Sequence, residues 1–236
     1  MLSYENRSSM AQPTPTPPSD HHLPLASTSP NNTLPSGTSI SAQPSAGSPP
    51  TEHHHLWLIT GPAGCGKSTV AEFLAQRMGL PFIEGDSFHP QSNVDKMSRG
   101  IPLTDADRWD WLIRLRTEAM ARLASTGAQG VVLTCSALKR KYRDVIRVAP
   151  YYSHDLRVHF VSLHAPEEVL TARVMARPGH FMGAHMVHSQ FDILEPPERD
   201  EDDVISVDVS GPIEQVEAEA LAKIQEVIRS ELVRGS

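Results

Sequence analysis

Eight consecutive residues, from Gly61 to Ser68, have the types and the order that binding of a phosphate chain requires. They read Gly-Pro-Ala-Gly-Cys-Gly-Lys-Ser and match the pattern G-x-x-x-x-G-K-[ST] without exception. Glycines let a loop fold tightly and direct its N–H groups at phosphate oxygens. In such a loop the ammonium of Lys67 reaches the β- and γ-phosphates, and the Ser68 hydroxyl can bind Mg²⁺.

The segments on either side of this loop favour a nucleotide site over a chance match. The apolar run 56–59 predicts a buried strand, and 67–78 has helical spacing that stops at Gly79. A helix that begins at the loop adds its positive end to the anion site. We therefore predict that ATP and Mg²⁺ bind through residues of the loop and its first helical turn: Gly61, Pro62, Ala63, Gly64, Cys65, Gly66, Lys67, Ser68 and Thr69.

Two features near the loop refine this prediction. No N-K-x-D segment follows, which argues against a GTPase, and the run 131–134 ends in Thr134-Cys135-Ser136 without the aspartate of a Walker B strand. A second Mg²⁺ contact must therefore come from elsewhere, and Asp86 acting through water is a candidate. The Cys65 thiol beside a helix start gives the hypothesis of a lowered pKa and oxidative inactivation.

A candidate acceptor site follows the second predicted strand, at 85–90. Ligands of open parallel sheets bind outside the carboxyl ends of the strands, where Asp86 could orient a hydroxyl and take its proton. A helix cap is the alternative role for Asp86. Basic residues near the predicted strand ends suit an anionic acceptor, with arginine best for a carboxylate; they are Lys96, Arg108, Lys139 and Arg143. The alternative for 139–143 is a solvated helix face.

The order of the elements predicts one α/β domain over 53–236. Apolar runs alternate with helical patterns, which indicates a five-stranded parallel sheet flanked by helices on both faces. The pattern 104–107 predicts a capping box and a long helix with Leu112, Leu115, Ala119 and Leu123 inward. Residues 177–188 have no clear period and predict a lid. Strands are expected at 56–59, 81–83, 131–134, 158–163 and 204–209.

Several short motifs together give the chain a strong resemblance to the small, bacterial-type gluconokinases of the phosphate-loop kinase superfamily. The resemblance covers about 56–232, and its motifs occur in the family's order. Those before the third strand are Gly85-Asp86 with His89-Pro90, Lys96-Met97, Gly100 with Pro102-Leu103, Asp105 with Asp107-Arg108, and Trp111-Leu112. Those after it are Cys135–Lys139, Tyr142–Asp144, Arg177 with Gly179–Phe181, and Gln190-Phe191 with Leu194.

This resemblance implies a P-loop kinase fold and transfer of the ATP γ-phosphoryl group to the 6-hydroxyl of D-gluconate, feeding the pentose phosphate pathway. Lys67, Asp86 and Arg177 would be catalytic, and Arg173 would stack on adenine. Asp86, His89, Lys96, Arg108, Lys139 and Arg143 would bind gluconate. A homodimer is implied as well. The alternatives are another small-molecule kinase, of the shikimate or nucleoside-monophosphate type, and a nucleotide-binding regulatory protein without turnover.

Composition limits the remaining possibilities. Residues 1–52 hold half of the 20 prolines, no lysine and one arginine, Arg7, which predicts a disordered tail. The net charge of −7 argues against nucleic acid as main partner. No apolar run is long enough to span a membrane, and we expect a cytoplasmic protein. His180, His185 and His188 could bind Zn²⁺ but lack an obvious further ligand, and 53–55 is interpreted as the end of the tail.

Overall fold

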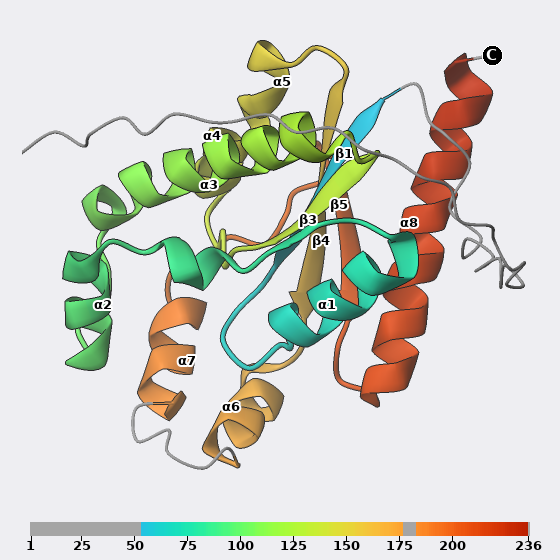
Figure 1. The fold of residues 1–236 in the computed structure, drawn as a ribbon. Helices are drawn as coiled ribbons and strands as arrows, with labels where there is room; N and C mark the ends of the chain where they lie inside the picture. The colour runs from blue at the N-terminus through green and yellow to red at the C-terminus, as the bar shows by residue number, and fades with distance from the viewer. Residues whose placement is uncertain (1–52, 177–182, 236) are drawn as a thin grey trace, which may run out of the picture. The chain divides into compact units, whose positions relative to one another are not determined.

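The computed structural model describes residues 53–176 and 183–235, which contain one five-stranded sheet. The strand order is β2-β3-β1-β4-β5, and every neighbouring pair is parallel (Figure 1). The predicted five-stranded parallel sheet is thereby confirmed. The strands are β1 (His54–Thr60), β2 (Phe82–Ile83), β3 (Gly130–Thr134), β4 (Leu156–His164) and β5 (Val204–Asp208).

Helices cover both faces of this sheet, as predicted. On one face lie α1 (Lys67–Met78) and α8 (Ile213–Gly235); on the other lie α3 (Asp105–Thr126), α4 (Arg140–Arg147) and the short α5 (Ala149–Tyr152) (Figure 1). The central strand β1 is buried from Leu56 to Thr60 because it lies between both helical layers. Its side chains alternate between two cores, with Trp57 and Ile59 in one and Leu56 and Leu58 in the other.

The long helix α3 begins and ends as its residue types predict. The Thr104 side chain accepts from the backbone of Asp107, and the Asp107 side chain accepts from the backbone of Thr104, so the capping box is present. Gly127 closes the helix with a positive φ of 61°, a conformation that glycine adopts at low cost. The predicted inward residues Leu112, Leu115, Ala119 and Leu123 are all buried.

Because all strands are parallel, their carboxyl ends meet at one edge of the sheet. The shorter elements at this edge are η1 (Gly85–Phe88), α2 (Gln91–Ser98), α6 (Glu167–Met175) and α7 (Gly183–Phe191). The expectation of an irregular lid over 177–188 is wrong for 183–188, which form the start of α7. Residues 177–182 and the predicted tail, 1–52, lie outside the described residues. No helix in the described ranges has the length and apolar character needed to cross a membrane.

Candidate active site

The loop between β1 and α1 has the backbone geometry of a phosphate cradle. Gly61 has a φ of 140°, and a Cβ at this position would lie 2.4 Å from the carbonyl oxygen of Leu163. Gly64 has a φ of 83°, and a Cβ there would lie 2.7 Å from Cγ2 of Val174. Only glycine satisfies both the dihedral angle and the close approach. These two glycines pack the loop against the end of β4 and against α6.

Side chains hold the loop in position without a ligand. The Lys67 ammonium donates to the carbonyl oxygens of Gly61, at 3.0 Å, and Pro62, at 3.1 Å. The backbone N–H of Ala63 donates to Oε1 of Gln190 on α7, at 2.6 Å. Sequence analysis assigned no role to Gln190, although it belongs to a motif of the resemblance. Its contact joins α7 to the phosphate loop.

Cys65 in the same loop is buried, with 2 % of its surface exposed. Burial raises the pKa of its thiol, because the thiolate would lose its hydration. The hypothesis of a lowered pKa at this cysteine is therefore wrong. Its sulfur instead fills space beneath the loop, 2.9 Å from where a Cβ on Gly61 would lie.

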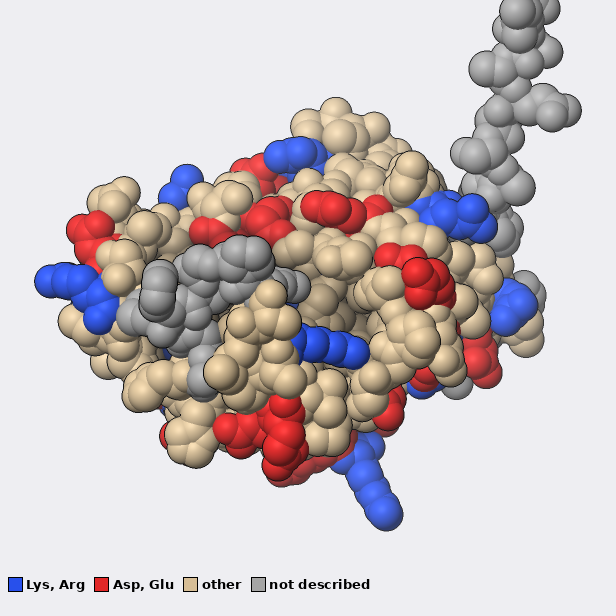
Figure 2. Space-filling model, turned by 90° about the horizontal axis from the view of Figure 1, so that it is seen from below, with Lys and Arg blue, Asp and Glu red and all other residues tan. Residues whose placement is uncertain are grey.

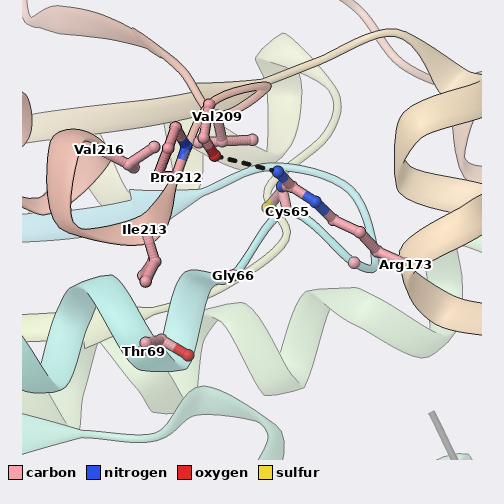
Figure 3. A pocket seen from close by; sticks show the side chains of 10 residues that line it. Cys65, Gly66, Thr69, Arg173, Val209, Pro212, Ile213 and Val216 are labelled. Carbon is pink, nitrogen blue, oxygen red and sulfur yellow. Dashed lines mark hydrogen bonds between the residues drawn. The ribbon is translucent and has the colours of Figure 1, made fainter. Parts of the chain in front are cut away.

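A cavity of about 360 Å³ lies beside the loop, between α1, α6 and the start of α8. Arg173 reaches across it from α6 (Figure 3). It donates to the carbonyl oxygens of Ser210, at 3.4 Å, and Gly211, at 3.3 Å. An apolar wall next to this guanidinium suits a flat aromatic ligand. The wall is formed by Val209, Pro212, Ile213 and Val216.

Asp86 lies at the carboxyl end of β2, on the 3₁₀ helix η1, where 77 % of its side chain is exposed. The preceding Gly85 is fixed on both sides: its N–H donates to Thr134 Oγ1 at 3.0 Å, and its carbonyl accepts from Trp111 Nε1 at 2.9 Å. His89 stacks on Trp111 with ring centroids 3.9 Å apart, and burial lowers its pKa. The structure therefore holds the backbone of Asp86 firmly and leaves its carboxylate open.

Both lysines that were predicted to bind the acceptor are paired with carboxylates. The Lys96 ammonium lies 2.5 Å from Asp107, and the Lys139 ammonium lies 3.2 Å from Asp105. Asp105 also accepts from Lys141 and from the Tyr142 hydroxyl. From the sequence, Asp105 and Asp107 were predicted only as residues of the capping region. In the structure they also neutralise these two lysines.

Arg108 joins the two lysine pairs into one cluster. It donates to the carbonyl oxygens of Leu103 and Thr104, and its guanidinium lies 5.4 Å from the centre of the Tyr142 ring. Asn93 on α2 extends the cluster by donating to the carbonyl oxygen of Asp107 at 2.7 Å. We name the set Asp86, His89, Lys96, Asp105, Asp107, Arg108, Lys139 and Tyr142 the acceptor cluster.

Arg143 does not join this cluster, contrary to expectation. Its side chain is 3 % exposed and forms a two-bond ion pair with Glu201, with both N–O distances 2.7 Å. It also donates to the carbonyl oxygen of Glu195 at 3.1 Å. Lys139 precedes α4 as its N-cap, so the helical spacing that would align it with Arg143 does not apply. Arg143 therefore anchors the acidic segment 195–203 to α4, and its guanidinium is not available to a ligand.

The phosphate loop and the segment that carries Asp86 both contact the end of β3. The Gly85 N–H, next to Asp86, donates to Thr134 Oγ1 at 3.0 Å. The Ser136 carbonyl accepts from the Gly61 N–H at 3.3 Å. Figure 2 looks onto this side of the molecule, which is hollowed near its centre. The arrangement can bring a phosphate donor and a polar acceptor together.

The site residues also fit Mg²⁺, a hard cation that prefers oxygen ligands. Ser68 is exposed in the first turn of α1, and the open carboxylate of Asp86 belongs to the same edge of the sheet. By contrast, the three-histidine Zn²⁺ alternative gains no support. His188 bonds to Glu167 at 2.9 Å, no described metal-ligand group contains His185 or His188, and His180 lies outside the described residues, as does Arg177.

Comparison with known proteins gives a consistent family. A family model described as an AAA domain matches residues 56–196. A probable gluconokinase of Schizosaccharomyces pombe is 42 % identical over 176 residues, which are 75 % of this chain and 91 % of that protein. The thermoresistant gluconokinase of Escherichia coli is 38 % identical over 176 residues, covering 74 % and 97 %.

Solved structures agree with these relatives. The crystal structure of a gluconokinase from Sinorhizobium meliloti 1021 superposes with a TM-score of 0.67 at 42 % identity, covering 77 % of this chain and 98 % of that one. A putative kinase from Chloroflexus aurantiacus, at 19 % identity and a TM-score of 0.54, shares the fold. The phosphate loop, the parallel sheet and these similarities together establish that the chain belongs to the gluconokinase family of P-loop kinases.

Proposed function

We propose that the protein transfers the γ-phosphoryl group of ATP to the 6-hydroxyl of D-gluconate, giving 6-phospho-D-gluconate and ADP for the pentose phosphate pathway. The observation that carries this proposal is that the phosphate loop and the backbone next to Asp86 both bond to the end of β3 at the carboxyl edge of the sheet: Ser136 accepts from Gly61, and Thr134 accepts from Gly85. The named gluconokinases of 38–42 % identity support gluconate as the acceptor.

The phosphate end of the reaction depends on fixed positive groups. The loop N–H groups and the Lys67 ammonium hold the triphosphate, with the ammonium exchanging the carbonyls of Gly61 and Pro62 for phosphate oxygens. Ser68 holds Mg²⁺, which supplies neutralisation of the phosphate charge. Arg173 and the apolar wall of the cavity hold the adenine ring, and Arg177 is proposed to stabilise the charge of the transition state.

The acceptor end depends on orientation of one hydroxyl. Asp86 aligns the 6-hydroxyl and accepts its proton late in the transfer, because its carboxylate is open while its backbone is fixed. Lys96, Arg108 and Lys139 bind the gluconate carboxylate and hydroxyls, with His89 as a further hydroxyl partner. Since Lys96 and Lys139 are already paired with Asp107 and Asp105, gluconate must compete with these carboxylates, which favours a polyol acid over a simple anion.

A kinetic assay tests this proposal directly. Purified full-length protein is mixed with ATP, Mg²⁺ and D-gluconate, and product is detected by 6-phosphogluconate dehydrogenase, which reports only the 6-phosphorylated acid. Other sugar acids, shikimate and AMP are compared by ADP release. Turnover of gluconate at a kcat/KM at least tenfold above every other acceptor is expected. Faster turnover of shikimate or AMP contradicts the proposal, and so does nucleotide binding without turnover of any acceptor.

The assembly, location and N-terminal segment are part of the same proposal. By family resemblance we propose a cytoplasmic homodimer, with residues 1–52 as a disordered tail and 53–236 as the kinase domain. Light scattering after gel filtration measures the mass of the assembly, against 25.9 kDa for one chain. Rapid proteolysis confined to the first 52 residues is the expected result for the tail, and cleavage spread evenly over the chain contradicts it.

A further inference from the structure

Two buried histidines and one half-buried glutamate form a cluster at the opposite end of β1 from the phosphate loop. His55 is the second residue of β1, His159 lies in β4, and Glu231 is near the end of α8. His55 and Trp57 are two residues apart on β1, and Trp57 is the register partner of His159, so all three rings face the side that α8 covers. His55 is 3 % exposed and His159 is 7 % exposed.

Glu231 continues the inward side of α8, where the sequence otherwise places apolar residues. Val216, Ala220, Ile224 and Ile228 are buried on that side, and Glu231 follows Ile228 at a spacing of three residues, on the same helical face. A carboxylate at this position costs burial energy unless it is satisfied. Within the described residues Oε2 of Glu231 is buried and has no hydrogen-bond partner.

The distances within the cluster are close to those between ligands of one metal ion. Nδ1 of His55 lies 3.2 Å from Nε2 of His159 and 3.8 Å from Oε2 of Glu231. Nε2 of His159 lies 3.8 Å from Oε1 of Glu231. Zn²⁺ bonds of about 2.0–2.2 Å in a tetrahedron put neighbouring ligand atoms about 3.3–3.6 Å apart. Small side-chain rotations therefore bring all three groups to bonding distance of one ion.

The chemical state of the rings also suits a metal. Both rings are almost fully buried, and burial favours the uncharged imidazole over the imidazolium ion. Neutral imidazole is the form that binds metals. A hydrogen-bonded histidine pair without metal also explains the 3.2 Å contact, but it gives the buried Glu231 oxygen no donor.

We propose that His55, His159 and Glu231 bind one Zn²⁺ ion, with water as the fourth ligand. Two imidazoles and one carboxylate are a donor set that suits Zn²⁺. The ion would fasten the end of α8 to β1 and β4. His55 precedes Gly61 by six residues of extended chain, about 20 Å at 3.3 Å per residue, so the metal stabilises the fold and takes no part in phosphoryl transfer.

Metal titration of the full chain, purified without an affinity tag and treated with a chelator, tests this site. Calorimetry with Zn²⁺ should give one tight site per chain, and Co²⁺ should give the intense visible absorption of a tetrahedral ion, which Zn²⁺ then removes. Zn²⁺ should raise the melting temperature and leave kcat for gluconate unchanged. Absence of a stoichiometric site, or Co²⁺ absorption typical of an octahedral ion, overturns the proposal.

Three variants locate the ion. Glu231→Gln and His159→Gln should each weaken Zn²⁺ binding by more than the ~10- to 100-fold that is lost when a group hydrogen-bonded to a metal ligand is removed. His54→Gln is the matched control, because His54 is adjacent on β1 but bonds to Ala128 and Asp155. Unchanged binding in Glu231→Gln, whose partly exposed side chain makes misfolding improbable, overturns the proposal. The proposal is also overturned if His54→Gln loses Zn²⁺ binding while His159→Gln retains it, because that result places the ion at the histidines 53–55.

Discussion

The nucleotide half and the acceptor half of the active site are made of different chemical groups. The nucleotide half consists mainly of backbone, with glycine dihedral angles, loop N–H groups and the start of α1, to which Lys67 and Arg173 add charged side chains. The acceptor half consists of charged side chains, and within the acceptor cluster Lys96 and Lys139 already have carboxylate partners in Asp107 and Asp105. A backbone site is present before its ligand arrives, whereas a paired side-chain site must exchange one partner for another when it binds.

The largest effect is expected in the nucleotide half, at Lys67. Lys67→Ala removes the ammonium that exchanges loop carbonyls for phosphate oxygens, so kcat for gluconate should fall by at least about a thousandfold. The same loss should appear in slow ATP hydrolysis without acceptor, because the group acts on the phosphate chain. Circular dichroism and thermal melting serve as controls of folding. A decrease in kcat of less than tenfold would show that the backbone alone suffices.

The next effect concerns the acceptor half, where it distinguishes a cation that stabilises the fold, Arg143, from a cation that binds the ligand, Lys139. Arg143→Met leaves Glu201 buried without its main partner, and unfolding free energy should fall by about 3–5 kcal/mol. Lys139→Met is the matched control: its partner Asp105 is 36 % exposed, so stability should change by less than ~1 kcal/mol, while KM for gluconate rises. Urea unfolding measures the first quantity and initial rates the second. Unchanged stability with a raised KM in Arg143→Met would return Arg143 to the substrate site.

Asp86 should show the next largest effect. Asp86→Asn preserves shape but removes the proton acceptor, so kcat should fall on the order of a hundredfold. KM for ATP should stay the same, because Asp86 lies on η1 and not on the phosphate loop. Steady-state kinetics with each substrate varied in turn make this measurement. Near-normal kcat in Asp86→Asn would refute the catalytic role and leave the residue as a helix-end group.

These expectations show which parts of the site can be predicted from sequence. The phosphate loop and the five strands could be predicted because local spacing determines them: glycines at fixed intervals and apolar runs of strand length. The role of Arg143 could not, since its partner Glu201 comes 58 residues later in a segment without periodicity. Helix α7 shows a similar limit. Between 185 and 191 the buried residue is Val187, and one buried position does not make a periodic pattern in the sequence. Packing at that position therefore decides the structure of this segment.

The sequence contains one signal for the pairing of Lys139, namely the carboxylates of Asp105 and Asp107. Asp105 and Asp107 stand in the first turn of α3, where carboxylates favour the helix start. A capping role explained both residues locally and left no reason to seek further partners. Their contacts with Lys139 and Lys96 arise because α3 and α4 pack side by side and α2 precedes α3, which is a property of the tertiary fold.

The ion pair of Arg143 also predicts how stability depends on pH. Arg143 lowers the pKa of Glu201 to about 2, from an ordinary value of 4.5. A carboxyl with a lowered pKa stabilises the fold above its ordinary pKa, and this contribution disappears as the pH falls from about 4.5 toward 2. At neutral pH, the unfolding free energy of the Glu201→Gln variant should be lower than that of the natural chain. Between pH 4.5 and 2, it should decline less steeply than that of the natural chain. Parallel declines would show that Glu201 is not a source of acid lability.

The smallest predicted effect lies where α7 meets the phosphate loop. Gln190 accepts the N–H of Ala63 at 2.6 Å, so it adds one uncharged side-chain contact to the phosphate loop. Gln190→Ala removes a hydrogen bond of about 0.5–1.5 kcal/mol, and kcat/KM for ATP should fall about two- to tenfold. Gln190→Glu keeps an acceptor but places a negative charge beside the triphosphate, so its loss should be greater than that of alanine. If alanine and glutamate are both neutral, this contact does not contribute to nucleotide binding, and the nucleotide half depends on its backbone together with Lys67 and Arg173.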